Sequence, residues 1–173
     1  GLLLMALSNK YGSMLLTTGN KSEIAVGYST IYGDMCGGYN PIKDLYKTRL
    51  YSICKWRNSN HEAWMKGPKG SVIPKSILEK SPTAELRPNQ TDQDSLPPYE
   101  VLDSILESLI ENDMSISEIV KQGHDYNIVK KIEKLVYQSE YKRFQSAPGV
   151  HLTKKSFQLS RRYPIVQNWR DKL

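Results

Sequence analysis

The chain contains 173 residues, of which 39% are hydrophobic and 24% are charged, and its formal net charge is +6. This length suits one domain, and the negative mean hydropathy leaves no apolar run near the roughly 20 residues of a membrane span. We therefore expect no membrane segment. The two cysteines, Cys36 and Cys54, form no CxxC pair and favour a reducing, cytoplasmic setting over a disulfide framework.

The basic residues are dispersed rather than clustered. The chain carries 24 Lys and Arg against 18 Asp and Glu, but it has no tract of five or more basic residues. The net charge favours an anionic partner such as a nucleotide, a nucleic acid or an acidic surface, but the dispersed basic residues give nucleic-acid binding only weak support. A generically soluble surface explains a charge of this size about as well.

The first residues are apolar and do not include an initiating methionine. Residues 1–7 lack the preceding basic segment and the following small-residue cleavage site of a signal peptide. Residues 2–10 instead predict a buried helix, because apolar side chains occur almost all round it, and Gly12 would end that helix. We expect the sequence to be a piece of a longer protein.

The next segment predicts an α/β layer. Residues 13–18 are typical of a short, buried parallel strand, and Asn20 or Ser22 can cap a helix that begins near Glu23. In α/β folds, ligands gather at the carboxyl ends of strands. This rule places a candidate site at residues 17–23.

The rest of the chain is predicted to be largely helical. Between the helices, residues 81–98 are polar and rich in proline, and such a loop inside a compact domain is usually a functional lid or a disordered linker. We favour a mobile lid over residues 84–98. Apolar spacing and capping residues predict helices over residues 47–56, 74–80 and 101–110, from the capping box Ser115 to Glu118 onward, and over residues 128–136.

Local signatures of several enzyme classes do not occur in the sequence. His61, His124 and His151 lack the spacing of zinc ligands, and no serine stands in a GxSxG elbow. Residues 17–23 offer a glycine turn, hydroxyls and a carboxylate that could hold a nucleotide phosphate and its Mg²⁺, but they do not form a Walker loop. A capped helix after a strand is the simpler explanation of this turn.

Nine short motifs are spread along nearly the whole chain. They lie at residues 7–10 (LSNK), 16–23 (LTTGNKSE), 25–28 (AVGY), 32–38 (YGDMCGG), 41–44 (PIKD), 81–90 (SPTAELRPNQ), 94–99 (DSLPPY), 140–143 (EYKR) and 161–165 (RRYPI). In these motifs and in their order, the chain resembles the synthetase domain of glutamine-dependent NAD⁺ synthetases. The number of matching motifs and their common order make the resemblance far more specific than any single glycine motif.

The resemblance implies an α/β fold and a two-step amidation. The implied fold is a partial Rossmann-like layer of the adenine nucleotide alpha hydrolase type (N-type ATP pyrophosphatase), with a predominantly helical carboxy-terminal part, and residues 1–173 would form the carboxy-terminal portion of the synthetase domain. ATP would adenylate the nicotinate carboxylate of deamido-NAD⁺, and ammonia from a glutaminase domain would then displace AMP to give NAD⁺. ATP and Mg²⁺ are the implied cofactors, no protein nucleophile is needed, and the full-length relatives are homo-oligomers.

The same resemblance assigns binding roles by position. Thr18, Lys47 and Thr83 match ATP contacts of the family. Glu23 matches a Mg²⁺ ligand of the ammonia-dependent branch and a deamido-NAD⁺ contact of the glutamine-dependent branch, and both roles stay open. The other deamido-NAD⁺ positions, which lie partly across a dimer interface in the family, are Tyr28, Ser29, Thr30, Ile31, Asp34, Tyr141 and Lys142.

The sequence also departs from the family pattern. Ile31 and Gly38 stand where the ammonia-dependent branch has a lysine and an aspartate, which places the chain nearer the glutamine-dependent branch. The family's pyrophosphate loop and glutaminase domain do not occur in these 173 residues, so we expect this chain to be inactive alone. Another ATP pyrophosphatase with a different acceptor, or a non-catalytic nucleotide-binding or oligomerisation module, remains an alternative.

Overall fold

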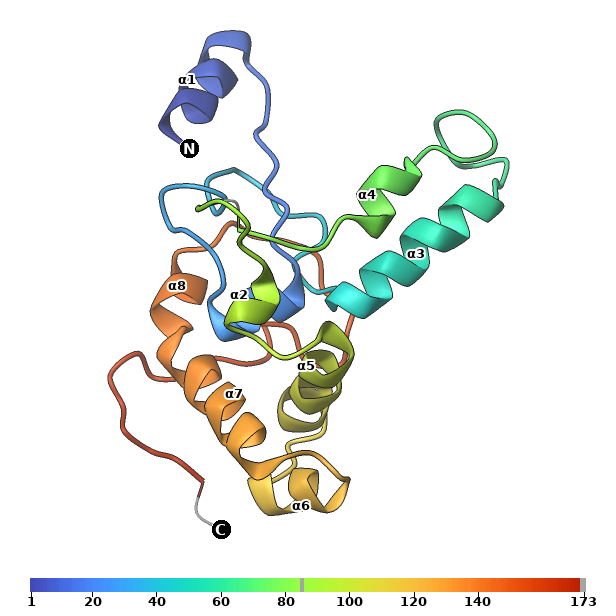
Figure 1. Cartoon of the computed structure of the whole chain (residues 1–173). Coiled ribbons are helices and arrows are strands. Elements are labelled where there is room, and N and C mark those ends of the chain that lie inside the picture. The colour runs from blue at the N-terminus through green and yellow to red at the C-terminus, as the bar shows by residue number, and fades with distance from the viewer. Residues whose placement is uncertain (85, 172–173) are drawn as a thin grey trace.

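The fold is a small helical body from which two segments extend (Figure 1). A computed structural model describes residues 1–84 and 86–171. Glu85, which belongs to the expected lid, lies outside the described residues. The helical elements are α1 (Leu2–Tyr11), α2 (Lys21–Val26), α3 (Lys47–Ser59), α4 (Lys75–Glu79), the 3₁₀ turn η1 (Asp92–Asp94), α5 (Tyr99–Leu106), the π-helical turn η2 (Glu107–Glu111), α6 (Ile116–Lys121), α7 (Tyr126–Gln138) and α8 (Glu140–Phe144).

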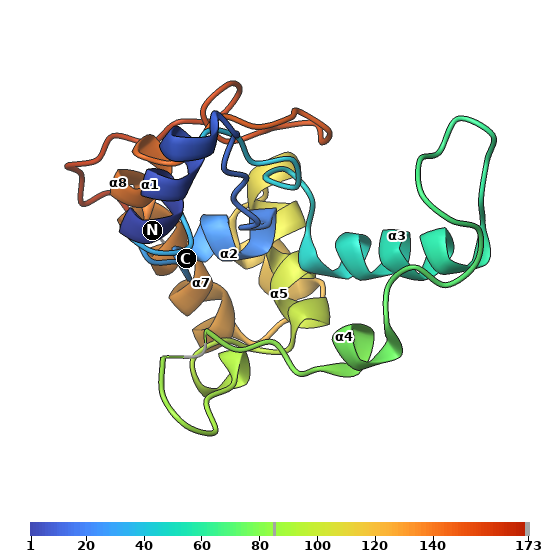
Figure 2. The same ribbon diagram turned by 90° about the horizontal axis from the view of Figure 1, so that it is seen from above.

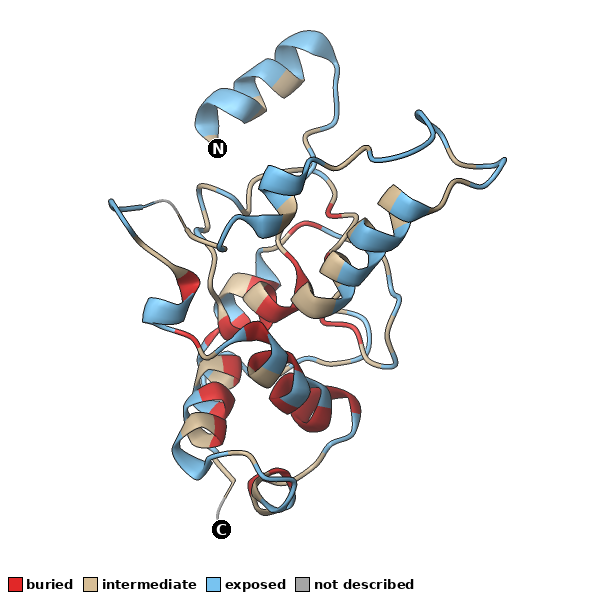
Figure 3. Cartoon of the chain, turned by 45° about the vertical axis from the view of Figure 1, so that its right-hand side comes forward, coloured by how far each residue is buried: buried red, intermediate tan, exposed pale blue. Residues whose placement is uncertain are grey.

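The helix predicted over residues 2–10 is confirmed, but its predicted burial is wrong. α1 ends at Gly12, which has the expected left-handed conformation with φ of 62°. The helix stands apart from the body and contains no buried residue, and Leu2 is 84% exposed (Figures 1 and 3). A helix with apolar side chains on all faces is buried only when other elements pack around it. None of the described elements encloses α1 in this way.

The strand predicted over residues 13–18 is reduced to a single parallel bridge. Leu16 pairs with Tyr39, and the backbone N–H of Thr17 donates to the Tyr39 carbonyl at 2.9 Å. The partner segment then turns away, because Asn40 pairs with Gly149 instead. A strand needs a neighbouring strand along its length. The predicted α/β layer is therefore confirmed only in part, because the pairing is parallel, as predicted, but consists of one bridge.

α2 lies at the centre of the body. Asn20 caps it, and the side chain of Glu23 accepts in return from the Asn20 N–H, so the predicted cap is confirmed as a capping box. Gly27 ends the helix with φ of 72°, and a Cβ at this position would lie 2.2 Å from the Ser139 hydroxyl oxygen. Only glycine fits both the backbone angle and this contact.

The apolar core is built by the carboxy-terminal helices, as the helical periodicity predicted. α5 and α7 pack against each other and against α2, while α6 packs against η2 and α7, and the inward faces of these helices carry the buried residues in Figure 3. Ser115 opens α6 with the predicted capping box. The fully buried apolar residues of these helices are Leu102, Ile105, Leu106, Ile110, Ile116, Ile119, Val129, Ile132 and Val136.

α3 and α4 form an arm that projects from the body in both views (Figures 1 and 2). α3 runs to Ser59, three residues beyond the predicted helix, and contains no buried residue. Its first residue, Lys47, lies at the base of the arm. The long loop that follows α4 returns to the body, where Lys131 of α7 donates its ammonium to the Ser95 carbonyl at 2.6 Å. Of the described helices, none has both the length and the apolar character needed to cross a membrane.

Candidate functional site

Five of the predicted site residues meet at one cavity of about 250 Å³. The cavity lies where the arm, the loop after α4 and the end of α2 come together. It is lined by Glu23, Tyr28, Asp34, Lys47 and Thr83 of the predicted set, and by Tyr51, Ile77, Lys80, Ser81, Pro82, Ala84 and Asp92. Residues separated by up to 69 positions in sequence are therefore neighbours in space.

An ion pair between Glu23 and Lys47 forms one wall of the cavity. The Lys47 ammonium lies 2.8 Å from Oε1 of Glu23, and both side chains are largely shielded from solvent. Oε2 of Glu23 accepts the backbone N–H of Asn20 at 3.2 Å. The ammonium also lies 5.3 Å from the centre of the Tyr99 ring. These contacts give the cation a defined position, which an exposed surface lysine would not have.

The backbone of Lys47 is held as firmly as its side chain. Its N–H donates to the Ser22 hydroxyl at 2.9 Å, and that hydroxyl donates to Oδ1 of Asp103 at 2.5 Å. Oδ2 of Asp103 accepts from both the N–H and the hydroxyl of Thr48, at 2.9 and 2.8 Å. Burial raises the pKa of Asp103, against the opposing effect of these hydrogen bonds.

Tyr28 and Asp92 form the wall nearest the loop. Tyr99 donates its hydroxyl to Oδ2 of Asp92 at 2.6 Å, while Oδ1 of Asp92 is buried and has no hydrogen-bond partner among the described residues. Gln90 donates to the Tyr28 hydroxyl at 3.4 Å. Burial, together with the negative charge of Asp92, raises the pKa of Tyr28. The loop thus contacts Tyr28 through Gln90 and Asp92.

The segment from Tyr28 to Asp34 is a compact turn beside the cavity. The backbone N–H of Thr30 donates to Oδ1 of Asp34 at 2.6 Å, and the Ser29 hydroxyl lies 3.3 Å from the Met35 sulfur. Ile31 is half-buried. Of these positions, only Tyr28 and Asp34 line the cavity.

Besides Ser29, Thr30 and Ile31, three predicted residues lie outside the cavity: Thr18, Tyr141 and Lys142. Lys142 donates from its ammonium to the carbonyls of Gly27 and Ser29, both at 2.7 Å, so it contacts the predicted dinucleotide segment through the backbone. Tyr141 is exposed on α8, and Thr18 is exposed between the parallel bridge and α2. The structure therefore joins Lys142 to residues 27–29 but does not bring Thr18 to Lys47.

Glu23 is the carboxylate of the cavity that the family resemblance assigns to a divalent cation, and Asp34 and Asp92 line the same cavity. Within residues 1–84 and 86–171, no three histidine, cysteine, aspartate or glutamate side chains form a cluster suited to a metal ion. Mg²⁺ commonly takes one or two carboxylates, with phosphates and water completing its shell. The half-buried carboxylate of Glu23 faces the cavity and fits one such position, although Lys47 already pairs with it.

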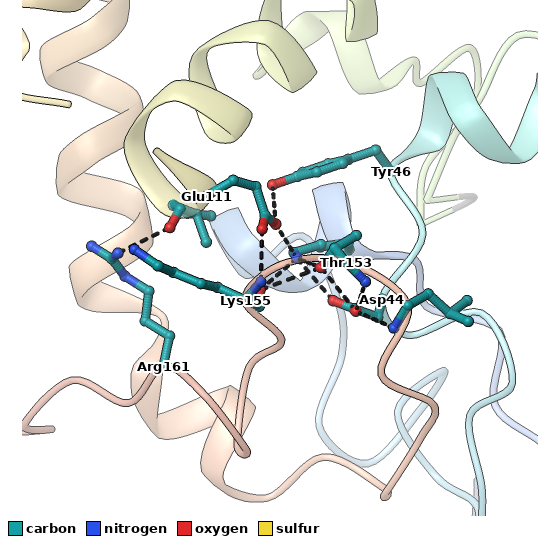
Figure 4. A network of polar contacts seen from close by, with 9 residues as sticks. Asp44, Tyr46, Glu111, Thr153, Lys155 and Arg161 are labelled. Atoms are coloured by element: carbon teal, nitrogen blue, oxygen red, sulfur yellow. Dashed lines mark hydrogen bonds and ion pairs between the residues drawn. The ribbon is translucent and has the colours of Figure 1, made fainter. Parts of the chain in front are cut away.

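A buried polar network around Lys21 was missed by the sequence analysis (Figure 4). The Lys21 ammonium lies 2.8 Å from Oδ1 of Asp44 and 2.5 Å from Oε1 of Glu111, and its side chain has no solvent exposure. The ammonium also donates to the Lys155 carbonyl at 2.7 Å and to the Thr153 hydroxyl. Lysine is rarely buried, and none of its partners is close in sequence, so no local signal could have indicated the network.

A larger cavity of about 630 Å³ lies on the other side of α3. Its lining includes Tyr46, Arg49, Trp56, Glu107 and Glu111, and none of the predicted site residues. The smaller cavity is the candidate site because Glu23, Lys47 and Thr83 line it, and not because of its volume.

The chain is similar to known proteins of one family. Residues 1–146 match the NAD synthase family. A glutamine-dependent NAD⁺ synthetase of Rhodobacter capsulatus is 66% identical over 171 residues, which cover 99% of this chain and 31% of that protein. A second relative of the same name, from Xanthomonas campestris, is 52% identical over 98% of this chain and 29% of its own length.

A solved structure agrees with these relatives. The crystal structure of a glutamine-dependent NAD⁺ synthetase from Cytophaga hutchinsonii superposes with a TM-score of 0.72 at 25% identity, over 95% of this chain and 26% of that one. The chain thus spans about a third or less of the length of the proteins that it matches. With 146 of its 173 residues matched, the chain belongs to the NAD synthase family.

Proposed function

We propose that this chain is the carboxy-terminal part of the synthetase domain of a glutamine-dependent NAD⁺ synthetase. The names of its relatives support this proposal, and the observation that carries it is the meeting of Glu23, Lys47 and Thr83 at one cavity. These residues come from α2, α3 and the long loop, and they carry the charges and the hydroxyl that a nucleotide site requires.

The reaction proposed for the full-length enzyme is the amidation of deamido-NAD⁺. The nicotinate carboxylate attacks the α-phosphorus of ATP, and pyrophosphate leaves with the electrons of the broken P–O bond. Ammonia then attacks the acyl carbon of the adenylate, loses a proton, and displaces AMP to give the amide of NAD⁺. A protein contributes to such steps chiefly by positioning and by stabilising charge.

Lys47 and Thr83 are the proposed ATP contacts within this chain, and Thr18 is a third. Lys47 presents a fixed ammonium to the cavity, which suits a phosphate oxygen better than a mobile surface cation does. Thr83 begins the proposed lid over residues 84–98 and offers a hydroxyl to the same space. The first turn of α3 is already capped by Ser22 and Asp103, so the lysine side chain rather than the helix end would bind the phosphate.

Glu23 is proposed to contact deamido-NAD⁺ or to serve as one ligand of the Mg²⁺ that accompanies ATP. When bound, Mg²⁺ would offset the negative charge of the phosphates. The pairing of Glu23 with Lys47 keeps the carboxylate directed toward the cavity in either role.

The deamido-NAD⁺ site is proposed to extend along residues 28–31 and Asp34 toward Tyr141 and Lys142. Lys142 supports this segment through the carbonyls of Gly27 and Ser29. Tyr141 is 44% exposed, which leaves it accessible to a dinucleotide held by a second subunit. Ammonia would come from a glutaminase domain of the same enzyme.

The test is mass-spectrometric detection of NAD⁺ and AMP from the full-length protein with ATP, Mg²⁺, deamido-NAD⁺ and either glutamine or ammonia. Equal amounts of NAD⁺ and AMP are expected from both nitrogen sources. Lys47→Gln should reduce product formation with either source, while Lys121→Gln on the exposed side of α6 should not. A folded protein that makes no NAD⁺ from either source would overturn the proposal in favour of another acceptor.

A further inference from the structure

Asp103 lies outside the cavity, yet it joins the two helices that carry the Glu23–Lys47 pair. It belongs to α5 and is only 5% exposed. Its two carboxylate oxygens accept three hydrogen bonds, one from Ser22 of α2 and two from Thr48 of α3. A buried carboxylate is costly unless such donors compensate it, so its presence here calls for a reason beyond packing.

The start of α3 lacks a local cap. Its N-cap residue is Tyr46, whose side chain makes no capping hydrogen bond, whereas α7 is capped by its own N-cap residue, Asp125. The first N–H groups of α3 donate instead to side chains of other helices. The Thr48 N–H donates to Asp103 of α5, 55 residues away, and the Lys47 N–H donates to Ser22 of α2. A cap made in this way fixes α3 relative to α2, which a local cap would not do.

Packing alone holds α3 weakly, because the helix contains no buried residue. Unsatisfied N–H groups at a helix start favour fraying. Lys47 is the first residue of the helix, so fraying would displace its backbone and, with it, the ammonium that pairs with Glu23. The hydrogen bonds of Ser22 and Asp103 act on the residue that the cavity uses.

We propose that Asp103 is a positioning residue that, through Ser22 and Thr48, holds the first turn of α3 so that the Lys47 ammonium meets the phosphates of ATP. This inference rests on the proposed function, since it concerns the same nucleotide site. Asp103 itself does not touch the substrate. Its effect is transmitted by Lys47.

The test is a double-mutant cycle in the full-length enzyme with Asp103→Asn, Lys47→Gln and the pair together. In Asp103→Asn, the amide oxygen is expected to stay on the two donors of Thr48, so the NH₂ group faces Ser22 and leaves the Ser22 hydroxyl proton without its acceptor. We expect the KM for ATP to rise about tenfold, as the loss of one well-placed charged hydrogen bond predicts, with the KM for deamido-NAD⁺ unchanged. In the Lys47→Gln background, the same change should add nothing.

Two further variants separate positioning from stability. Ser22→Ala removes the acceptor of the Lys47 N–H and should raise the KM for ATP in the same way. Asp125→Asn, a helix-capping aspartate far from the cavity, is the matched control and should leave both KM values unchanged. Faster amide exchange at Lys47 and Thr48 in Asp103→Asn, but not in Asp125→Asn, should accompany the change in KM.

The possible results are distinct. A fall in kcat at unchanged KM would overturn the inference, because it would indicate a loss of folded enzyme. An Asp103→Asn effect that multiplies that of Lys47→Gln would overturn it too, because the two residues would then act independently. If the enzyme is active and Lys47→Gln raises the KM for ATP but Asp103→Asn does not, the role of Asp103 is overturned and the proposed function stands. A wild-type enzyme that makes no NAD⁺ would overturn the proposed function together with it.

Discussion

The ammonium of Lys21 lies 2.8 Å from Oδ1 of Asp44, and neither side chain is more than 2% exposed. Glu111 on η2 supplies a second carboxylate to the same ammonium at 2.5 Å (Figure 4). The ring of Tyr46 lies 5.1 Å from the cation and donates its hydroxyl to Glu111 at 3.2 Å. Through Lys21, the first turn of α2 is joined to the segment before α3 and to the end of the α5–η2 helix.

Lys21→Met is expected to destabilise the chain by roughly 3–5 kcal/mol. The substitution leaves two buried carboxylates without their cation, and an uncompensated buried charge is far more costly than a lost surface pair. Urea unfolding followed by circular dichroism gives the change in free energy. The exposed pair Lys75–Glu79 is the control, and Lys75→Met should cost less than about 1 kcal/mol because both side chains are solvated.

Neutralising all three charges provides the complementary measurement. Lys21→Met combined with Asp44→Asn and Glu111→Gln should recover a large part of the lost stability, since no uncompensated charge then remains. A triple variant that is no more stable than Lys21→Met would mean that shape, not charge, determines the effect.

Local patterns predicted the helices well and predicted their surroundings poorly. Gly12, the capping box of Asn20 and the capping box of Ser115 mark helix ends that depend only on neighbouring residues, and the structure contains all three. The strand over residues 13–18 and the burial of α1 depend on partners elsewhere in space. The strand is confirmed only as one parallel bridge, and the predicted burial of α1 is wrong.

The residues discussed around the candidate site also fall into two groups, those that the sequence predicted and those that only the structure reveals. Glu23, Lys47 and Thr83 were identified through family resemblance, and the cavity brings them together. Asp103 and Lys21 gave no sequence signal, because a charged residue within a helical pattern is ordinarily read as exposed. Their partners lie 81 and 90 residues away, at Ser22 and Glu111, so only the folded chain reveals the contacts.

The buried ammonium of Lys43 predicts a pH dependence of stability. It donates to Ser146, Ala147 and Gln158 but forms no ion pair among the described residues, and burial lowers the pKa of Lys43 from 10.5 to about 8. Between pH 8 and 10.5, the unfolded chain holds a proton that the folded chain has released. The contribution of Lys43 to the free energy of unfolding therefore increases as the pH rises through this window.

Comparison with Lys43→Met isolates this contribution. The difference in free energy of unfolding between the wild type and the variant should grow in favour of the wild type from pH 7.5 to pH 10. Lys121→Met, which removes an exposed lysine, should give a difference that is flat with pH. Urea titrations at four pH values measure both series. A flat difference for Lys43→Met as well would show that Lys43 keeps its proton throughout.

The proposed lid predicts protection by nucleotide. Leu86 is 73% exposed at the start of the loop, and chymotrypsin should cut after it readily in the free enzyme. If residues 84–98 close over ATP that Thr83 contacts, added ATP should slow this cut several-fold. Trp64, which is 78% exposed in the loop between α3 and α4, is an internal control whose cutting should not change. Equal rates after Leu86 with and without ATP would exclude the closure.

Substitution of Lys142 tests whether the two proposed substrate subsites are separate. Its ammonium holds the carbonyls of Gly27 and Ser29, which flank Tyr28 at the start of the proposed dinucleotide segment. Lys142→Met removes two charge-assisted hydrogen bonds, so residues 28–31 lose their support while the Glu23–Lys47 pair keeps its own contacts. We expect the KM for deamido-NAD⁺ to rise by about tenfold or more and the KM for ATP to stay within about twofold of the wild type.

The matched control for Lys142 is Lys131→Met on α7. Lys131 also donates its ammonium to a backbone carbonyl, that of Ser95, at 2.6 Å, but it does not line the cavity. Because Ser95 belongs to the proposed lid over residues 84–98, loss of Lys131 acts on the lid and not on residues 28–31. If both variants raise the KM for deamido-NAD⁺ equally, the effect reflects a general loss of order rather than support of residues 28–31. If Lys142→Met raises both KM values together, the two subsites share this support, and the assignment of Lys142 to deamido-NAD⁺ alone is wrong.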